Sequence, residues 1–140
     1  MRSFFLDSNA LIYWLHPDSP MHDDVSSFLH EAFRRDCGVY VLSSTLNEVY
    51  YALHSHYMNE KQARAAIATV ADVCDLVDLT TPLVRASLDS DEPDYEDGLV
   101  RATAEALQVD AIVSYDKRAF KHSFIPRLTA SEATDLLREG

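Results

Sequence analysis

Short apolar segments of β type alternate with longer helical segments along this chain. The β-type segments cover residues 3–6, 39–42, 76–79 and 111–114, with a shorter one at 127–129. Between them, apolar residues recur at helical spacing, as in residues 21–35. Strands separated by helices pair in parallel, and helices must cover both faces of such a sheet. The pattern predicts an α/β fold: a mainly parallel sheet of four to five strands in a three-layer α/β/α sandwich.

Small polar residues precede the helical segments and suit the N-cap position. The expected caps are Ser8 or Asn9, Ser44 or Thr45, Asn59, Thr81 and Thr129. Asn59 and Thr129 are each followed, three residues on, by the Gln or Glu of a capping box. Gly38 is expected to end the helix of residues 21–35.

Length and composition favour one domain over residues 1–140. The chain is 47% hydrophobic, which suits a single core at this length. No apolar run approaches the roughly 18 residues of a membrane-spanning helix. The apolar run at the N-terminus stops at Asp7, short of the ~7–15 residue core of a secretory signal. Cys37 and Cys74 are expected to be reduced thiols. We therefore expect a cytoplasmic protein without a membrane segment.

The formal net charge of −11 argues against nucleic-acid binding that depends mainly on phosphate contacts. Three interpretations remain open. The acid forms a solvated surface, as in proteins from a salty cytoplasm; or part of it forms a metal site; or part of it meets a basic partner protein. Because bulk charge bears on association rather than fold, it weakens a nucleic-acid hypothesis without excluding one.

Four acidic residues flank the ends of the predicted strands. Asp7 directly follows the first strand, and Asp116 lies just past the fourth. Glu48 lies about one turn into the helix after the second strand, and Asp97 lies in the first turn of the helix before the fourth. Ligands of open parallel sheets bind beyond the carboxyl ends of the strands. We therefore expect the four carboxylates at one edge of the sheet.

Such a cluster needs a cation or protons. Two unit charges about 4 Å apart repel by roughly 4 kcal/mol at an effective dielectric near 20. Oxygen-only ligands favour Mg²⁺ or Mn²⁺, which activate water for phosphodiester hydrolysis. Taken singly, Glu48 or Asp97 is an ordinary helix-start acid, because 23 of the 140 residues are acidic. The combination of four carries the hypothesis.

Four segments also carry a likeness to a known family. They are Phe4-Phe5-Leu6-Asp7-Ser8-Asn9, Leu42-Ser43-Ser44-Thr45-Leu46-Asn47-Glu48, Asp94-Tyr95-Glu96-Asp97-Gly98 and Ile112-Val113-Ser114-Tyr115-Asp116-Lys117-Arg118-Ala119-Phe120. In this order they resemble the motifs of PIN-domain ribonucleases, and the length resembles that of VapC-like toxins of type II toxin–antitoxin systems. The likeness spans nearly the whole chain.

The resemblance implies a role for each matching residue. Asp7, Glu48, Asp97 and Asp116 would form an acidic quartet that is catalytic and binds Mg²⁺ or Mn²⁺. Asp94 is an extra acid three residues before Asp97, and Asp97 is the favoured ligand of the two. Asn9 and Ser114 are polar neighbours that would orient a ligand or water. Lys117 and Arg118 are cations that either contact substrate phosphates or are simply solvated.

The implied activity is metal-dependent endoribonuclease action on structured RNA such as tRNA. The implied partners are a cognate antitoxin and a second copy of the chain, and Tyr50, Tyr51 and Tyr57 suit either a dimer face or core packing. Two alternatives stay open. One is a receiver- or phosphatase-like domain that uses Asp7 as a phosphoryl acceptor. The other is a non-catalytic PIN-like scaffold that binds RNA or protein.

Overall fold

A sheet of five parallel strands forms the centre of the protein. The computed structural model describes residues 2–139. The strands are β1 (Ser3–Leu6), β2 (Gly38–Leu42), β3 (Asp75–Val77), β4 (Ala111–Val113) and β5 (Arg127–Leu128). Their order is β3-β2-β1-β4-β5, and each neighbouring pair is parallel. The predicted α/β fold with a parallel sheet is confirmed, with β1 at the middle.

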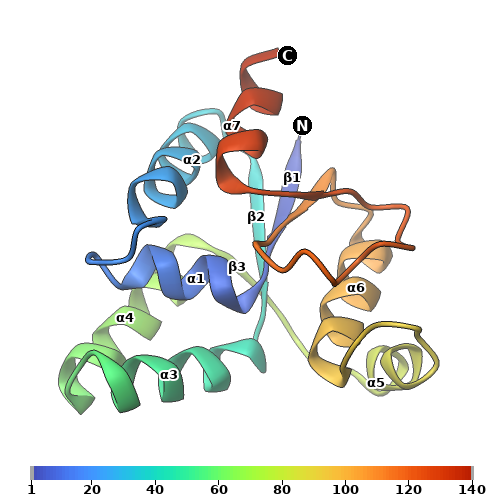
Figure 1. Cartoon of the computed structure of the whole chain (residues 1–140), viewed down its shortest axis with the longest axis horizontal. Coiled ribbons are helices and arrows are strands. Elements are labelled where there is room, and N and C mark those ends of the chain that lie inside the picture. Colours follow the sequence, from blue (N-terminus) through green and yellow to red (C-terminus); the bar gives the residue numbers. More distant parts are fainter. Residues whose placement is uncertain (1, 140) are drawn as a thin grey trace.

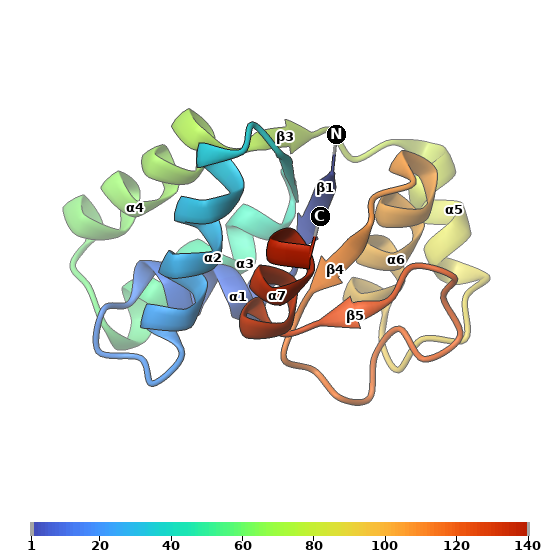
Figure 2. The ribbon, with the colours of Figure 1, turned by 90° about the horizontal axis from the view of Figure 1, so that it is seen from above.

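Seven helices cover the two faces of this sheet. They are α1 (Ser8–Leu15), α2 (His22–Arg34), α3 (Thr45–His56), α4 (Glu60–Val73), α5 (Thr81–Leu88), α6 (Tyr95–Leu107) and α7 (Ala130–Glu139). Helices α1 to α4 and α7 lie on one side of the strands, and α5 and α6 lie on the other (Figures 1 and 2). The three predicted layers are therefore present.

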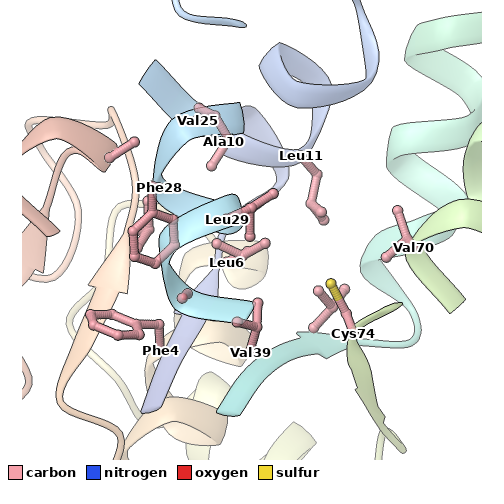
Figure 3. Packing of buried hydrophobic residues seen from close by; sticks show 14 of the residues in the cluster. Phe4, Leu6, Ala10, Leu11, Val25, Phe28, Leu29, Val39, Val70 and Cys74 are labelled. Carbon is pink, nitrogen blue, oxygen red and sulfur yellow. The ribbon is translucent and has the colours of Figure 1, made fainter. Parts of the chain in front are cut away.

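The alternation of side chains along β1 divides the core into two clusters. Phe4 and Leu6 face the cluster under α1, α2 and α7, while Phe5 faces the cluster under α6. Figure 3 shows the first cluster, where the rings of Phe4 and Phe28 meet edge to face at 4.9 Å. Because β1 is completely buried on both faces from Phe4 to Leu6, its carboxyl end is held at a defined place.

Some helix ends differ from the sequence expectation by one or two residues. Asp7, rather than Ser8 or Asn9, is the N-cap of α1, because its carboxylate reaches the Ser8 N–H. Thr80 caps α5 in place of Thr81. The expected role of Gly38 was wrong. Helix α2 already ends at Arg34, Asp36 adopts the left-handed conformation that turns the chain, and Gly38 belongs to β2.

Other local expectations are confirmed. The Asn59 and Thr129 capping boxes are both formed. Cys37 and Cys74 are free thiols, and burial raises the pKa of Cys74 to about 12. Tyr51 and Tyr57 lie on the surface, which rules out core packing for these two rings. From residue 2 to residue 139, no helix has the length and apolar character needed to cross a membrane.

Candidate active site

The four candidate acids line one cavity at the carboxyl end of the sheet. Asp7 follows β1, Glu48 lies in the first turn of α3, Asp97 lies in the first turn of α6, and Asp116 follows β4. The cavity has a volume of about 160 Å³. Its remaining lining residues are Ser8, Asn9, Thr45, Asp94, Glu96 and Val100. Side chains more than 100 positions apart in the sequence thus meet here, at the edge that the strand pattern indicates.

Asp7 is buried in this site, and both of its carboxylate oxygens accept hydrogen bonds. Its Oδ1 accepts from the Ser8 N–H at 2.8 Å. Its Oδ2 accepts from the Ser114 hydroxyl at 2.8 Å and from the Asn9 amide at 3.4 Å. Burial raises the pKa of Asp7, the hydrogen bonds from Ser114 and Ser8 oppose that rise, and the charges of nearby acids add to it. The carboxylate is therefore fixed in place in an environment that disfavours its charge.

Asn9 and Ser114 tie the start of α1 to the segment that follows β4. The Asn9 Oδ1 accepts from the Tyr115 N–H at 3.1 Å, and its Nδ2 donates to the Ser114 hydroxyl at 3.3 Å. The same hydroxyl accepts from the Asp116 N–H at 3.1 Å. One serine therefore contacts both Asp7 and the backbone of Asp116. Asn9 and Ser114, which the sequence indicated as polar neighbours, both contact Asp7, and their role toward a ligand stays a prediction.

Asp94 and Asp97 have different roles at the start of α6. Asp94 is the N-cap, and its Oδ1 accepts from the Asp97 N–H at 2.8 Å. Asp97 is buried, and its pKa is raised to about 7, first by burial and then by the charges of Asp94, Asp7 and Asp116. Asp94 thus caps the helix with one oxygen, while Asp97 shares the cavity with the other acids.

Sequence reasoning missed one acid of the cavity, Glu96. Burial raises the pKa of Glu96, and the charges of Asp94 and Asp7 raise it further. Glu48 lines the same cavity, and its pKa is raised first by burial and then by the Glu96 charge. The Ser8 hydroxyl also donates to Glu48, at 3.3 Å. The available signal was position, since Glu96 precedes Asp97 in the same helical turn.

The basic residues stand outside the cavity. In the described part of the chain, the cavity lining includes no Lys or Arg. Arg118 is largely exposed, with its Nε 3.9 Å from the Asp116 Oδ1. The same Oδ1 accepts from the Arg118 N–H at 2.9 Å, which turns the chain just after Asp116. Lys117, which lies between these two residues, is exposed as well.

Comparison with known families shows which family the chain belongs to. Residues 3–118, most of the chain, match the family described as PIN domain. The chain belongs to the PIN-domain family. Among curated proteins, no sequence matches it.

Solved structures with the same fold include two from toxin–antitoxin systems. VapC20 of Mycobacterium tuberculosis, described as a Sarcin-Ricin loop cleaving toxin, is 15% identical. The match covers 81% of this chain and 89% of VapC20, with a TM-score of 0.67. A chain of VapBC2 from Rickettsia felis, bound to a DNA fragment from its promoter, is also 15% identical. There the match covers 91% of this PIN domain and 98% of the other chain, with a TM-score of 0.70.

The donor chemistry of this PIN-domain cavity fits a hard divalent ion. Among the described residues that line it, all titratable groups are carboxylates and none is His or Cys. Burial first, and then repulsion between the acids, raises the pKa values of Asp7, Glu48, Glu96 and Asp97, and a bound cation would favour their charged forms. Within residues 2–139, however, no three His, Cys, Asp or Glu side chains are already arranged to hold a metal ion. The cavity has donors suited to a hard divalent ion but no preset ligand geometry.

Proposed function

We propose that this PIN domain is a metal-dependent endoribonuclease that hydrolyses a phosphodiester with an activated water and without a covalent intermediate. The observation that carries the proposal is the meeting of Asp7, Glu48, Asp97 and Asp116 around one cavity lined by oxygen donors. Repulsion among clustered carboxylates is costly, so a site of this kind is suited to a divalent cation and to chemistry that uses one.

In this proposal, Asp7, Asp97, Asp116 and Glu48 would hold Mg²⁺ or Mn²⁺. When bound, such an ion supplies a lowered pKa for water and positive charge for a phosphate oxygen. Asp94 also lines the cavity, and the resemblance favours Asp97 over it as the ligand. Asn9 and Ser114 keep Asp7 in place through hydrogen bonds to its Oδ2. Such supporting contacts orient a carboxylate before substrate binds.

Glu48 is suited to take the proton from the attacking water. In the ion-free site, burial and then the Glu96 charge raise the pKa of Glu48; with the ion bound, a Glu48 oxygen that does not contact it would accept the proton. Glu96 lines the same cavity and would hold that proton next. Lys117 and Arg118, which follow Asp116 directly, are placed to contact substrate phosphates at the rim.

The biological part of the proposal comes from the resemblance. The chain would be the toxin of a toxin–antitoxin pair in the cytoplasm, cleaving structured RNA such as tRNA and restrained by a cognate antitoxin. VapC20 is described as cleaving the sarcin–ricin loop, and VapBC2 is described with promoter DNA. A homodimer is also part of the proposal, and the exposed Tyr51 and Tyr57 are available to such an interface. Sedimentation analysis of the purified chain tests it.

Phosphoryl transfer to Asp7 is less well supported. A phosphoryl acceptor of this kind needs a second acid beside it or two residues on, and Ser8 and Asn9 occupy those places. Incubation with a small phosphodonor, followed by intact-mass measurement, distinguishes this alternative. A non-catalytic scaffold is opposed by the presence of all four acids at one cavity.

The deciding experiment compares Asp7→Asn with Asp110→Asn in RNA cleavage with Mg²⁺ or Mn²⁺. Asp110 is a matched control, because it too accepts a backbone N–H, that of Ser3 at 2.8 Å, but at the opposite end of β1. We expect Asp7→Asn to lower the rate at least about 100-fold, since even outer-shell partners of metal ligands contribute 10- to 100-fold. Asp110→Asn should cleave like the wild type. Equal cleavage after exhaustive removal of divalent ions would refute the mechanism.

A further inference from the structure

Arg101 on α6 joins the two loops that border the carboxylate cavity. Its Nη1 donates to Glu92 at 3.1 Å, in the loop of residues 89–94. Its Nη2 donates to the carbonyl of His122 at 3.1 Å, in the loop of residues 117–126. The first loop leads into the N-cap of α6, and the second leaves the site after β4. Arg101 therefore holds together the chain segments on two sides of the site.

Glu92 makes a further link between these loops, beside the contact of Asp91 with the His122 ring. Its side chain is only 3% exposed, so its charge must be paired. One carboxylate oxygen accepts from Arg101, and the other accepts from the Phe120 N–H at 2.7 Å. A buried carboxylate that uses both oxygens in this way has little freedom to move. The Phe120 backbone is thus fastened to the loop that precedes α6.

Phe120 needs such a fastening, because its backbone is strained. Its φ is 69°, the left-handed conformation that a bulky side chain adopts rarely. Its ring is buried in the core cluster with Leu99 and Val100, which holds the residue from the other side. The turn between Asp116 and Phe120 is therefore fixed at both ends, by the Asp116 carboxylate at Arg118 and by Glu92 at Phe120. Lys117 and Arg118 lie within this turn.

We propose that Glu92, held by Arg101, is a positioning residue that fixes the turn presenting Lys117 and Arg118 to the substrate beside Asp116. This inference rests on the proposed RNA cleavage. The placement matters because every charged residue that lines the cavity in the described chain is acidic, so cations that are to meet phosphate must be held beside it. Glu92 does not line the cavity, and its charge is the last-ranked of the causes that raise the pKa of Asp97, so its main effect is exerted through the turn and on substrate binding.

A first test needs no RNA. Lys117, Arg118 and Lys121 are trypsin sites, and trypsin cuts a segment when it opens locally. We expect Glu92→Gln, which keeps the shape but removes the charge, to speed cleavage at these sites at least about tenfold. Glu31→Gln is the control, since Glu31 also accepts from two arginines, Arg34 and Arg35, on the distant helix α2. Arg101→Lys serves as a second variant if Glu92→Gln fails to fold. Unchanged cleavage in folded variants overturns the proposal.

A second test uses the kinetics of RNA cleavage. We expect Glu92→Gln to raise KM for RNA several-fold and to leave kcat within about threefold, because the carboxylates keep their own hydrogen bonds. In a Lys117→Ala/Arg118→Ala background, Glu92→Gln should raise KM no further. An undiminished rise in that background shows that Glu92 acts by another route. If the wild type cleaves no RNA at all, the proposed function fails, and the trypsin result alone decides whether Glu92 fixes the turn.

Discussion

Asp97 shows at the level of one residue that the site lowers the stability of the fold. Its pKa is raised from 3.8 to about 7 by burial and by neighbouring acids. Between these values, the folded state binds more protons than the unfolded state does. Stability rises with pH only where the unfolded state binds more protons, so here it must fall as the pH rises. The raised pKa values of Asp7, Glu48 and Glu96 act in the same direction.

The resulting prediction concerns stability without divalent ions. From about pH 4 to about pH 7, the free energy of unfolding of the wild type should fall, and that of Asp97→Asn should fall less. Urea unfolding of both proteins at several pH values in excess chelator measures this. Asp94→Asn keeps an N-cap side chain but removes one of the charges that raise the pKa of Asp97, so its loss of stability should be smaller and should end at a lower pH. Identical slopes for all three proteins would contradict the argument.

At the level of helices and strands, periodicity was enough to predict the α/β fold. The segments at β1, β2 and β4 became largely buried strands, whereas the edge strands β3 and β5 are exposed or half-buried. The candidate acids met at one edge because parallel strands share a direction. Which side chain caps a helix was harder to predict. The Asp7 carboxylate caps α1 in place of Ser8 or Asn9. Glu96 was missed because a first-turn acid has an ordinary explanation in helix capping and the helix dipole. The link between Glu92 and Phe120 joins residues 28 apart and leaves no periodic signal.

Gly98 is a position in α6 where helix propensity alone misjudges the effect of a substitution on stability. By propensity alone, alanine at this interior position of α6 gains about 1 kcal/mol. In the structure, a Cβ at Gly98 would lie 2.2 Å from the Ser87 hydroxyl and 3.0 Å from the Ser87 carbonyl oxygen. The Ser87 hydroxyl cannot move aside without losing a hydrogen bond, since it donates to the Tyr95 carbonyl at 2.7 Å. The missing side chain is therefore what allows α5 and α6 to pack closely.

We expect Gly98→Ala to lower the free energy of unfolding by about 1–2 kcal/mol, because overpacking costs about 1–3 kcal/mol and outweighs the helix gain. Urea denaturation of the two proteins gives the value. In a Ser87→Ala background the nearest clash is absent, so the same substitution should cost less there. A more stable Gly98→Ala protein would show that α5 moves aside at no cost.

For the whole molecule, the net charge of −11 and the carboxylate cavity pose the same physical problem. In the proposed function, a polyanionic substrate would approach an acidic protein whose site is lined by several carboxylates. Lys117 and Arg118 offset this only at the rim, and they are few. A bound divalent cation acts at the cavity itself, where it neutralises charge between the carboxylates and attracts phosphate. Metal binding should therefore stabilise the fold as well as permit catalysis.

The last prediction is that Mg²⁺ or Mn²⁺ raises Tm. At a concentration 100 times its Kd, an ion that binds only the folded state adds about 2.7 kcal/mol, or roughly 8 °C for a domain of this size. The rise should be larger near pH 8 than near pH 5, because protons compete with the ion for the same carboxylates. Asp7→Asn should show a much smaller rise, and Asp110→Asn a full one. A single cooperative transition would support one domain over residues 1–140. If Tm is equally insensitive to Mg²⁺ and Mn²⁺ in the wild type and in Asp7→Asn, the cavity binds no such ion, and the four carboxylates need another explanation.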